Sequence, residues 1–164
     1  MKRWGSSRLA RLSLLTALAM ILSFVESQIP ALVAVPGVKV GLANIAVVFA
    51  LYRLGCGPAA LISLVRVVLV GLLFGNGISL LYSLAGAAVS LTVMALLKRA
   101  QVFSPMAVSV AGGVLHNLGQ LGMACLVTGA EVLRYYAPVL VLSGTVAGVV
   151  IGVLAGILLG RLPK

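Results

Sequence analysis

The chain has 164 residues, of which 62% are hydrophobic and 9% are charged, and its mean hydropathy is +1.25. A water-soluble domain of this size must keep a polar exterior, so the composition excludes one and predicts a protein whose solvent is lipid. The formal charge of +10 comes from twelve Lys and Arg against two acidic residues. Because the basic residues lie at segment ends, we interpret the charge as an orientation signal and expect no nucleic-acid partner.

The apolar stretches are continuous and do not alternate with period two, which favours membrane-spanning helices over a barrel. Breaks rich in Gly and Pro separate them, such as "SQIPALVAVPG", "GCGP" and "GNG". We therefore expect one integral membrane domain over residues 1–164, an all-α bundle. Its six predicted transmembrane helices cover about 8–26, 40–54, 58–75, 78–97, 106–128 and 136–160. The second segment is short for a full span.

The first segment follows a basic N-terminal stretch and has an apolar core, so residues 1–34 could also be read as a cleaved signal peptide. The apolar stretch is longer than a usual signal core, and "ALVA" is only a loose cleavage site, so we favour a membrane helix. Its pairs of small residues, Ser13 with Ala17 and Ala19 with Ser23, are spaced for close approach of another helix.

Arg66 lies near the midpoint of the third segment, in "LISLVRVVLVGLLF". A guanidinium at that depth is costly unless it faces the bundle interior or a cavity. The second segment brings Lys39 and Asn44 near the surface that we expect to be outer, and Glu26 ends the first segment on the same side.

The fourth and fifth segments add further polar groups in the middle or outer half of the bilayer. Tyr82 and Ser83 lie in the fourth, and "GGVLHNLGQLGMA" in the fifth places His116, Asn117 and Gln120 on one broad face. This convergence predicts a polar cavity that opens outward. The predicted ligand contacts are Arg66, His116, Asn117, Gln120, Asn44, Tyr82 and Ser83. The alternative is structural: Arg66 pairs with Glu26 or with carbonyl groups, and His116 bonds a neighbouring helix.

Glycine recurs at every fourth position of the sixth segment and forms a nearly continuous groove. Small residues at this spacing let another helix approach closely. The groove serves either packing within the bundle or docking of another membrane subunit. Its residues are Gly144, Gly148, Gly152, Gly156 and Gly160.

Basic residues divide unequally between the two sides of the predicted bundle. Nine fall on the side of the N-terminus, and only Lys39 and Arg134 fall on the other. The positive-inside rule therefore predicts that both termini are cytoplasmic, which requires an even number of spans.

Several kinds of chemistry lack the residues that they need. The chain has no Walker loop, so we do not expect it to hydrolyse nucleotides. It has no Asp for magnesium–diphosphate chemistry and no Cys/His metal spacing, so we expect no catalytic site, metal or cofactor. Cys56 and Cys125 fall near opposite faces of the membrane, which makes a disulfide between them implausible.

Four segments in order, "ESQIP", "PGVKVGLAN", "LHNLGQL" and "YYAPVLVLSG", resemble the Gx transporter family, also labelled heptaprenyl diphosphate synthase component I. The likeness covers about residues 8–160. That family is similar to the six-helix S components of energy-coupling-factor importers. The resemblance implies an outward pocket with a lid at about residues 27–39, which contains Pro30, Pro36 and Lys39. It also implies docking of a transmembrane coupling subunit at Ser13 and Ala17 or at Ala19 and Ser23, although alanine pairs are usual there.

Two functions follow from these observations. The first is a substrate-binding subunit in the bacterial cytoplasmic membrane, which captures a small vitamin-like or anionic solute from outside while a coupling subunit and an ATPase pair supply the work. The alternative is a non-catalytic membrane partner of a heptaprenyl diphosphate synthase. In both, the chain lies among membrane lipids.

Overall fold

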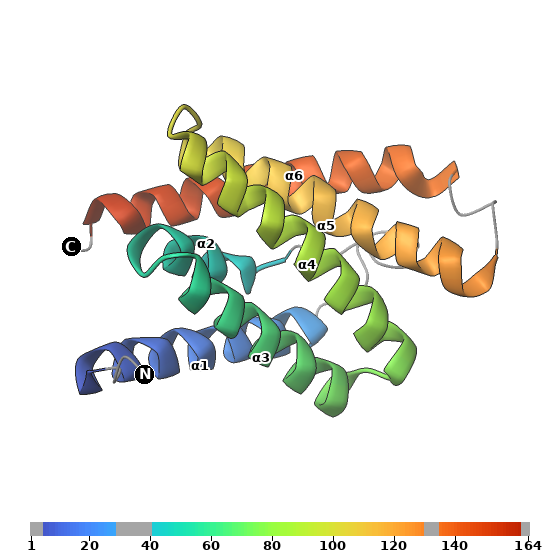
Figure 1. Cartoon of the computed structure of the whole chain (residues 1–164). Helices are drawn as coiled ribbons and strands as arrows, with labels where there is room; N and C mark the ends of the chain where they lie inside the picture. Colours follow the sequence, from blue (N-terminus) through green and yellow to red (C-terminus); the bar gives the residue numbers. More distant parts are fainter. Residues whose placement is uncertain (1–4, 29–40, 130–134, 162–164) are drawn as a thin grey trace.

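Figure 1 shows the computed structural model, which describes residues 5–28, 41–129 and 135–161. The regular elements in these ranges are helices: α1 (Ser6–Gln28), α2 (Asn44–Arg53), α3 (Cys56–Phe74), α4 (Gly77–Ala100), α5 (Pro105–Thr128) and α6 (Ala137–Arg161). Five of them, all except α2, are long and apolar enough to cross a membrane. Large apolar side chains on their outer faces are exposed, as lipid-facing residues are. The protein is therefore an all-helical, multi-pass membrane protein.

α2 departs from the predicted full span over residues 40–54. It begins only at Asn44 and has 10 residues, which cover about 15 Å, or half of a hydrocarbon core. Six of its residues are buried: Ile45, Ala46, Val47, Val48, Ala50 and Leu51. The described residues thus form five helices of spanning length and one short helix in the core of the bundle.

The boundaries of α4 and α5 follow from local hydrogen bonds. The Asn76 side chain accepts a bond from the Ser79 N–H at 2.8 Å, and the Ser79 hydroxyl accepts one from the Asn76 N–H at 2.9 Å, so this pair forms a capping box. Ser104 caps α5 by accepting a bond from the Ala107 N–H at 3.2 Å. α5 ends at Gly129, whose φ of 63° is the left-handed conformation that favours glycine.

The helices form two groups, which meet where α3 contacts α4 and where α2 contacts α6. α5 packs between α4 and α6, while α2 is contacted by α1, α3 and α6 (Figure 1). Because α2 is surrounded in this way, its aliphatic side chains form the largest share of the buried core. The centre of the bundle is therefore apolar, and a side chain that reaches it from α3 or α6 needs a hydrogen-bonding partner only if it is polar.

The two ends of the bundle differ in charge. The start of α1 and the ends of α2, α4 and α6 lie at the same end (Figure 1). That end carries the basic residues of the helices other than Arg66, namely Arg8, Arg11, Arg53, Lys98, Arg99 and Arg161. Glu26 lies near the end of α1, at the opposite end of the bundle. Cys56 and Cys125 are both free.

Candidate functional site

A small cavity lies where the end of α1 and the start of α2 meet α3, α5 and α6. Its volume is about 60 Å³, and we call it the Arg66 cavity. Of the residues predicted from the sequence to contact a ligand, five line it: Arg66, His116, Asn117, Gln120 and Asn44. The other lining residues are Glu26, Gly41, Gly113, Gly144, Ala147 and Ile151.

Arg66 reaches the cavity from the middle of α3. Its Nη2 donates to Asn44 Oδ1 at 3.4 Å, which is long for a hydrogen bond to nitrogen. Its Nε is buried and has no hydrogen-bond partner among the described residues. Glu26 is close enough to attract the guanidinium electrostatically. Among the described residues, Arg66 thus has the electrostatic attraction of Glu26 and one weak hydrogen bond, while a guanidinium offers five N–H donors.

Glu26 also positions the entry of α2. Its Oε1 accepts a hydrogen bond from the Gly41 N–H at 2.5 Å. Gly41 has a φ of 74°, and a Cβ there would come within 3.3 Å of Ile151 Cδ1. Glycine is therefore needed at this turn, because L side chains rarely adopt this backbone conformation. Glu26 consequently links the end of α1 to the residues that place Asn44 at the cavity.

His116 and Gln120 are one turn apart on α5 and contact each other. Gln120 Nε2 lies 3.0 Å from His116 Nε2. Which of the two nitrogens donates depends on the tautomer of His116. The contact places both polar side chains at the wall of the cavity.

Asn117 links two helices. Its Nδ2 donates to the Leu140 carbonyl at 2.9 Å and to the Ser143 hydroxyl at 3.2 Å, so it bonds α5 to α6. The side chain is buried, with 7% of its surface exposed. Asn117 lines the cavity, but its amide nitrogen is already used within the bundle.

Glycines bring α5 and α6 into direct backbone contact beside the cavity. A Cβ on Gly113 would lie 2.4 Å from the Gly144 carbonyl oxygen, and a Cβ on Gly148 would lie 2.5 Å from Val110 Cα. A Cβ on Gly152 would likewise meet Met106 Cα at 2.7 Å. The first three glycines of the α6 groove therefore face α5 inside the bundle. Gly156 has nothing within 4 Å of such a Cβ.

Not every predicted residue reaches the cavity. Tyr82 and Ser83 belong to α4, which packs on α5 and contributes no lining residue. Pro30, Pro36 and Lys39 of the expected lid lie outside the described residues. On α1, Ser13 and Ala17 are exposed, whereas Ala19 and Ser23 are buried. Of the two small-residue pairs, only the first is accessible to another subunit.

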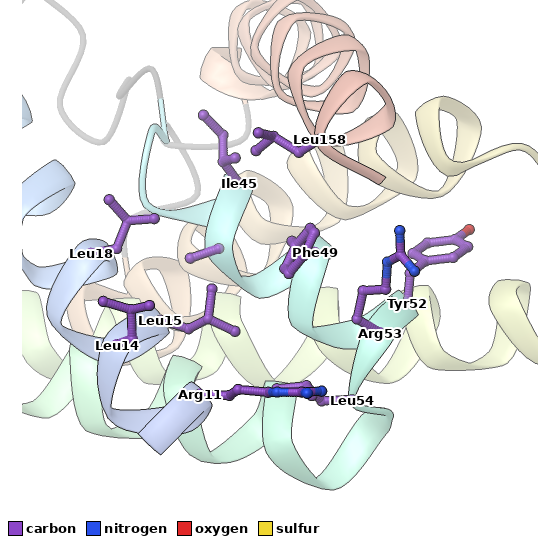
Figure 2. Close-up of a pocket in the computed structure, with 11 residues that line it drawn as sticks. Arg11, Leu14, Leu15, Leu18, Ile45, Phe49, Tyr52, Arg53, Leu54 and Leu158 are labelled. Carbon is purple, nitrogen blue, oxygen red and sulfur yellow. The ribbon is translucent and has the colours of Figure 1, made fainter. Parts of the chain in front are cut away.

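A second and larger hollow lies between α1 and α2 and was not predicted from the sequence. This α1–α2 groove has a volume of about 670 Å³. Most of the side chains around it are aliphatic, and two are arginines (Figure 2). It is lined by Arg11, Leu14, Leu15, Leu18, Ile45, Ala46, Phe49, Tyr52, Arg53, Leu54 and Leu158. The sequence signal for this groove was that Arg11 and Arg53 each stand next to leucines. That α1 and α2 lie side by side, however, is shown only by the tertiary structure.

Within the described ranges, no three side chains of His, Cys, Asp or Glu come together. The Arg66 cavity is lined by one guanidinium, one carboxylate, His116 and the side-chain amides of Asn44, Asn117 and Gln120. Its guanidinium suits an anionic or amide-bearing group.

Comparison with known families identifies one match, and it covers most of the chain. The family model described as heptaprenyl diphosphate synthase component I matches residues 15–158. Comparison with curated proteins and with solved structures gives no significant match. The matched range includes the lining residues of the Arg66 cavity and all of those of the α1–α2 groove except Arg11 and Leu14. The chain belongs to the heptaprenyl diphosphate synthase component I family.

Proposed function

We propose that the protein is a membrane-embedded binding subunit that receives the anionic group of a small organic solute at Arg66, as part of an importer similar to the energy-coupling-factor type. The observation that carries this proposal is the state of Arg66. A buried guanidinium with a partnerless Nε and one bond of 3.4 Å has donors left for a ligand. A cation in a membrane bundle is costly, and such residues usually mark a substrate pathway.

The size of the cavity limits what it can receive. Its volume of about 60 Å³ is far below the roughly 300 Å³ or more of a pocket that encloses a whole ligand. We therefore expect only the charged head of the solute to enter, such as a carboxylate. Arg66 supplies the positive charge, and the amide nitrogen of Asn44 orients the head by donating a hydrogen bond to it. The body of the solute would then lie toward the proposed lid at about residues 27–39.

The side of the membrane from which the solute binds follows from the charge of the two ends of the bundle. The basic end of the bundle contains the start of α1 and the end of α6, and the positive-inside rule assigns such an end to the cytoplasm. The cavity includes Glu26 and Asn44 near the opposite end. In this orientation both termini are cytoplasmic, and the solute arrives from the outer face of the cell membrane. ATP hydrolysis belongs to partner subunits, and the exposed Ser13 and Ala17 are the proposed contact for a coupling subunit.

The test is native mass spectrometry of the protein purified from its own membrane. We expect the wild type to retain a small molecule, and Arg66→Gln to lose it while keeping the same elution volume. Arg99→Gln is the matched control, because Arg99 is an exposed arginine at the other end of the bundle. Equal retention by Arg66→Gln and the wild type would refute the assigned role of Arg66.

The family match favours a second candidate. The family is described as component I of a heptaprenyl diphosphate synthase, so the protein could act as the non-catalytic membrane partner of a prenyl diphosphate synthase. A chain without Asp would need that partner to supply the metal-binding carboxylates. Affinity purification from native membranes separates the two candidates: an ATPase pair supports the importer, and a soluble aspartate-rich synthase supports the second role.

A further inference from the structure

The α1–α2 groove takes no part in the proposed solute site, and its chemistry is different. We propose that it binds a polyprenyl diphosphate, with the isoprenoid chain between α1 and α2 and the diphosphate at Arg11 and Arg53. This inference extends the synthase-partner role and does not involve the Arg66 cavity. Loss of solute binding in an Arg66 variant would therefore leave it untouched.

The groove has an apolar part and a cationic end. Along α1, Arg11 precedes Leu18 by about two turns, and along α2, Ile45 precedes Arg53 by slightly more than two turns. The two helices run in opposite directions, so both arginines fall at the same end (Figure 2). A ligand that fits must have an apolar chain at one end and a negative charge at the other.

The apolar part suits a single hydrocarbon chain. Its walls are leucines of α1 and the side chains of Ile45, Phe49 and Leu158. The volume of about 670 Å³ lies within the range of about 300–1,000 Å³ that is usual for pockets that enclose one small molecule. Burying a chain there gains dispersion contacts with both helices at once. Because the groove lies between α1 and α2 and receives only Leu158 from α6, we expect it to hold one chain.

The cationic end suits more than one negative charge. Arg53 Nη2 donates to the Leu159 carbonyl oxygen, which ties the guanidinium at the end of α2 to the backbone of α6. Arg11 is exposed and reaches the same end from α1. Two guanidinium groups match the multiple charges of a diphosphate better than the single charge of a phosphodiester lipid. This charge match selects a polyprenyl diphosphate over an ordinary anionic phospholipid.

The experiment measures binding of radiolabelled geranylgeranyl diphosphate to the full chain in phosphatidylcholine nanodiscs, with empty nanodiscs as background. We expect saturable binding that is roughly tenfold weaker in Arg11→Gln, since one charge-assisted contact is lost. Arg11 is the first choice because it is exposed, so the variant should fold. Arg99→Gln, the matched control, should bind like the wild type. Absence of saturable binding, or equal binding by Arg11→Gln, would overturn the proposal.

A second pair of variants tests whether the chain enters the groove. Leu14→Trp fills it at a residue that is 71% exposed, and Leu142→Trp adds the same bulk on α6 at a residue that is 67% exposed. We expect only Leu14→Trp to reduce binding. Equal binding by Leu14→Trp and the wild type would show that the chain lies elsewhere and overturn the assignment.

Competition by three compounds shows which parts of the ligand the groove recognises. Geranylgeraniol lacks the diphosphate, inorganic diphosphate lacks the chain, and phosphatidylglycerol is a singly charged two-chain lipid. The proposal expects each to compete at least tenfold more weakly than unlabelled geranylgeranyl diphosphate. Equal competition by the alcohol or by inorganic diphosphate would show that only one half of the ligand matters, and equal competition by phosphatidylglycerol would show general lipid binding. Any of these three results overturns the proposal.

Discussion

The Arg66 cavity and the α1–α2 groove share α2 but are built from opposite kinds of residue. Polar side chains from four helices, α1, α2, α3 and α5, surround the cavity, which is about 60 Å³, whereas mostly aliphatic side chains line the groove, which is about 670 Å³. The cavity could be predicted because polar residues are rare in an apolar sequence and each one stands out. The groove could not, because its leucines look like any lipid-facing residues until the helices are placed together.

The cavity and the groove also differ in how closely the helices beside them pack. The cavity adjoins a place where α5 and α6 touch through glycines, while the α1 side of the groove carries exposed side chains such as Leu14 and Leu18. Substitutions at the contact between α5 and α6 should therefore change stability, and substitutions of exposed groove residues should change only binding. Four substitutions test this difference, and the first should lower stability most.

The largest effect is expected for Gly113→Leu. Even a Cβ at this position would lie 2.4 Å from the backbone oxygen of Gly144, so α5 and α6 must separate. We expect loss of at least about 3 kcal/mol and aggregation in detergent, measured by size-exclusion chromatography and thermal unfolding. Gly156→Leu is the control, because a Cβ there has nothing within 4 Å. Similar behaviour of the two variants would contradict the packing contact.

Arg66→Met should separate stability from binding. Removing a guanidinium with a buried, partnerless Nε relieves a cost of about 1–3 kcal/mol, so the empty protein should be as stable as the wild type or more stable. The retained solute and any stabilisation that it confers should disappear. Thermal unfolding before and after the ligand is removed measures both effects. A large loss of stability in the empty protein would instead assign Arg66 a structural role.

Asn117→Leu should cost a moderate amount of stability. The variant loses the hydrogen bonds from α5 to the Leu140 carbonyl and the Ser143 hydroxyl, and such bonds are worth about 0.6–2 kcal/mol in membrane bundles. The control is Thr145→Val, since the Thr145 hydroxyl bonds only to Val141 of its own helix. We expect a lower thermal midpoint for Asn117→Leu alone, and equal midpoints would mean that this link is dispensable.

The smallest effect on stability is expected for Arg11→Gln. Arg11 is exposed at the mouth of the groove, and substitutions of this kind usually change the free energy of unfolding by less than about 0.5 kcal/mol. The thermal midpoint in detergent should match that of the wild type. A clear loss of stability would mean that the groove arginines support the fold rather than a ligand.

Much of the candidate site was predictable from the sequence because polar residues inside a membrane bundle cost free energy. Arg66, His116 and Gln120 are polar groups in helices whose other residues are apolar, and only a cavity or a partner makes such residues tolerable. Tyr82 and Ser83 do not line the Arg66 cavity. Helical periodicity shows which residues share a face but not which helix that face meets. The full span expected for α2 was wrong for a related reason: apolarity shows that a segment is buried, not whether lipid or protein buries it.

The sequence by itself determined that the chain is an all-helical membrane protein with most of its positive charge at one end, because apolar length and basic flanks depend only on local composition. It also determined that glycines on α6 allow a close approach, because their spacing is a local property. The tertiary structure was needed to show that this approach is to α5, that α2 is a short core helix, and that Arg11 and Arg53 line the same groove. These facts depend on contacts between distant segments, and a pattern within one segment does not specify its partner.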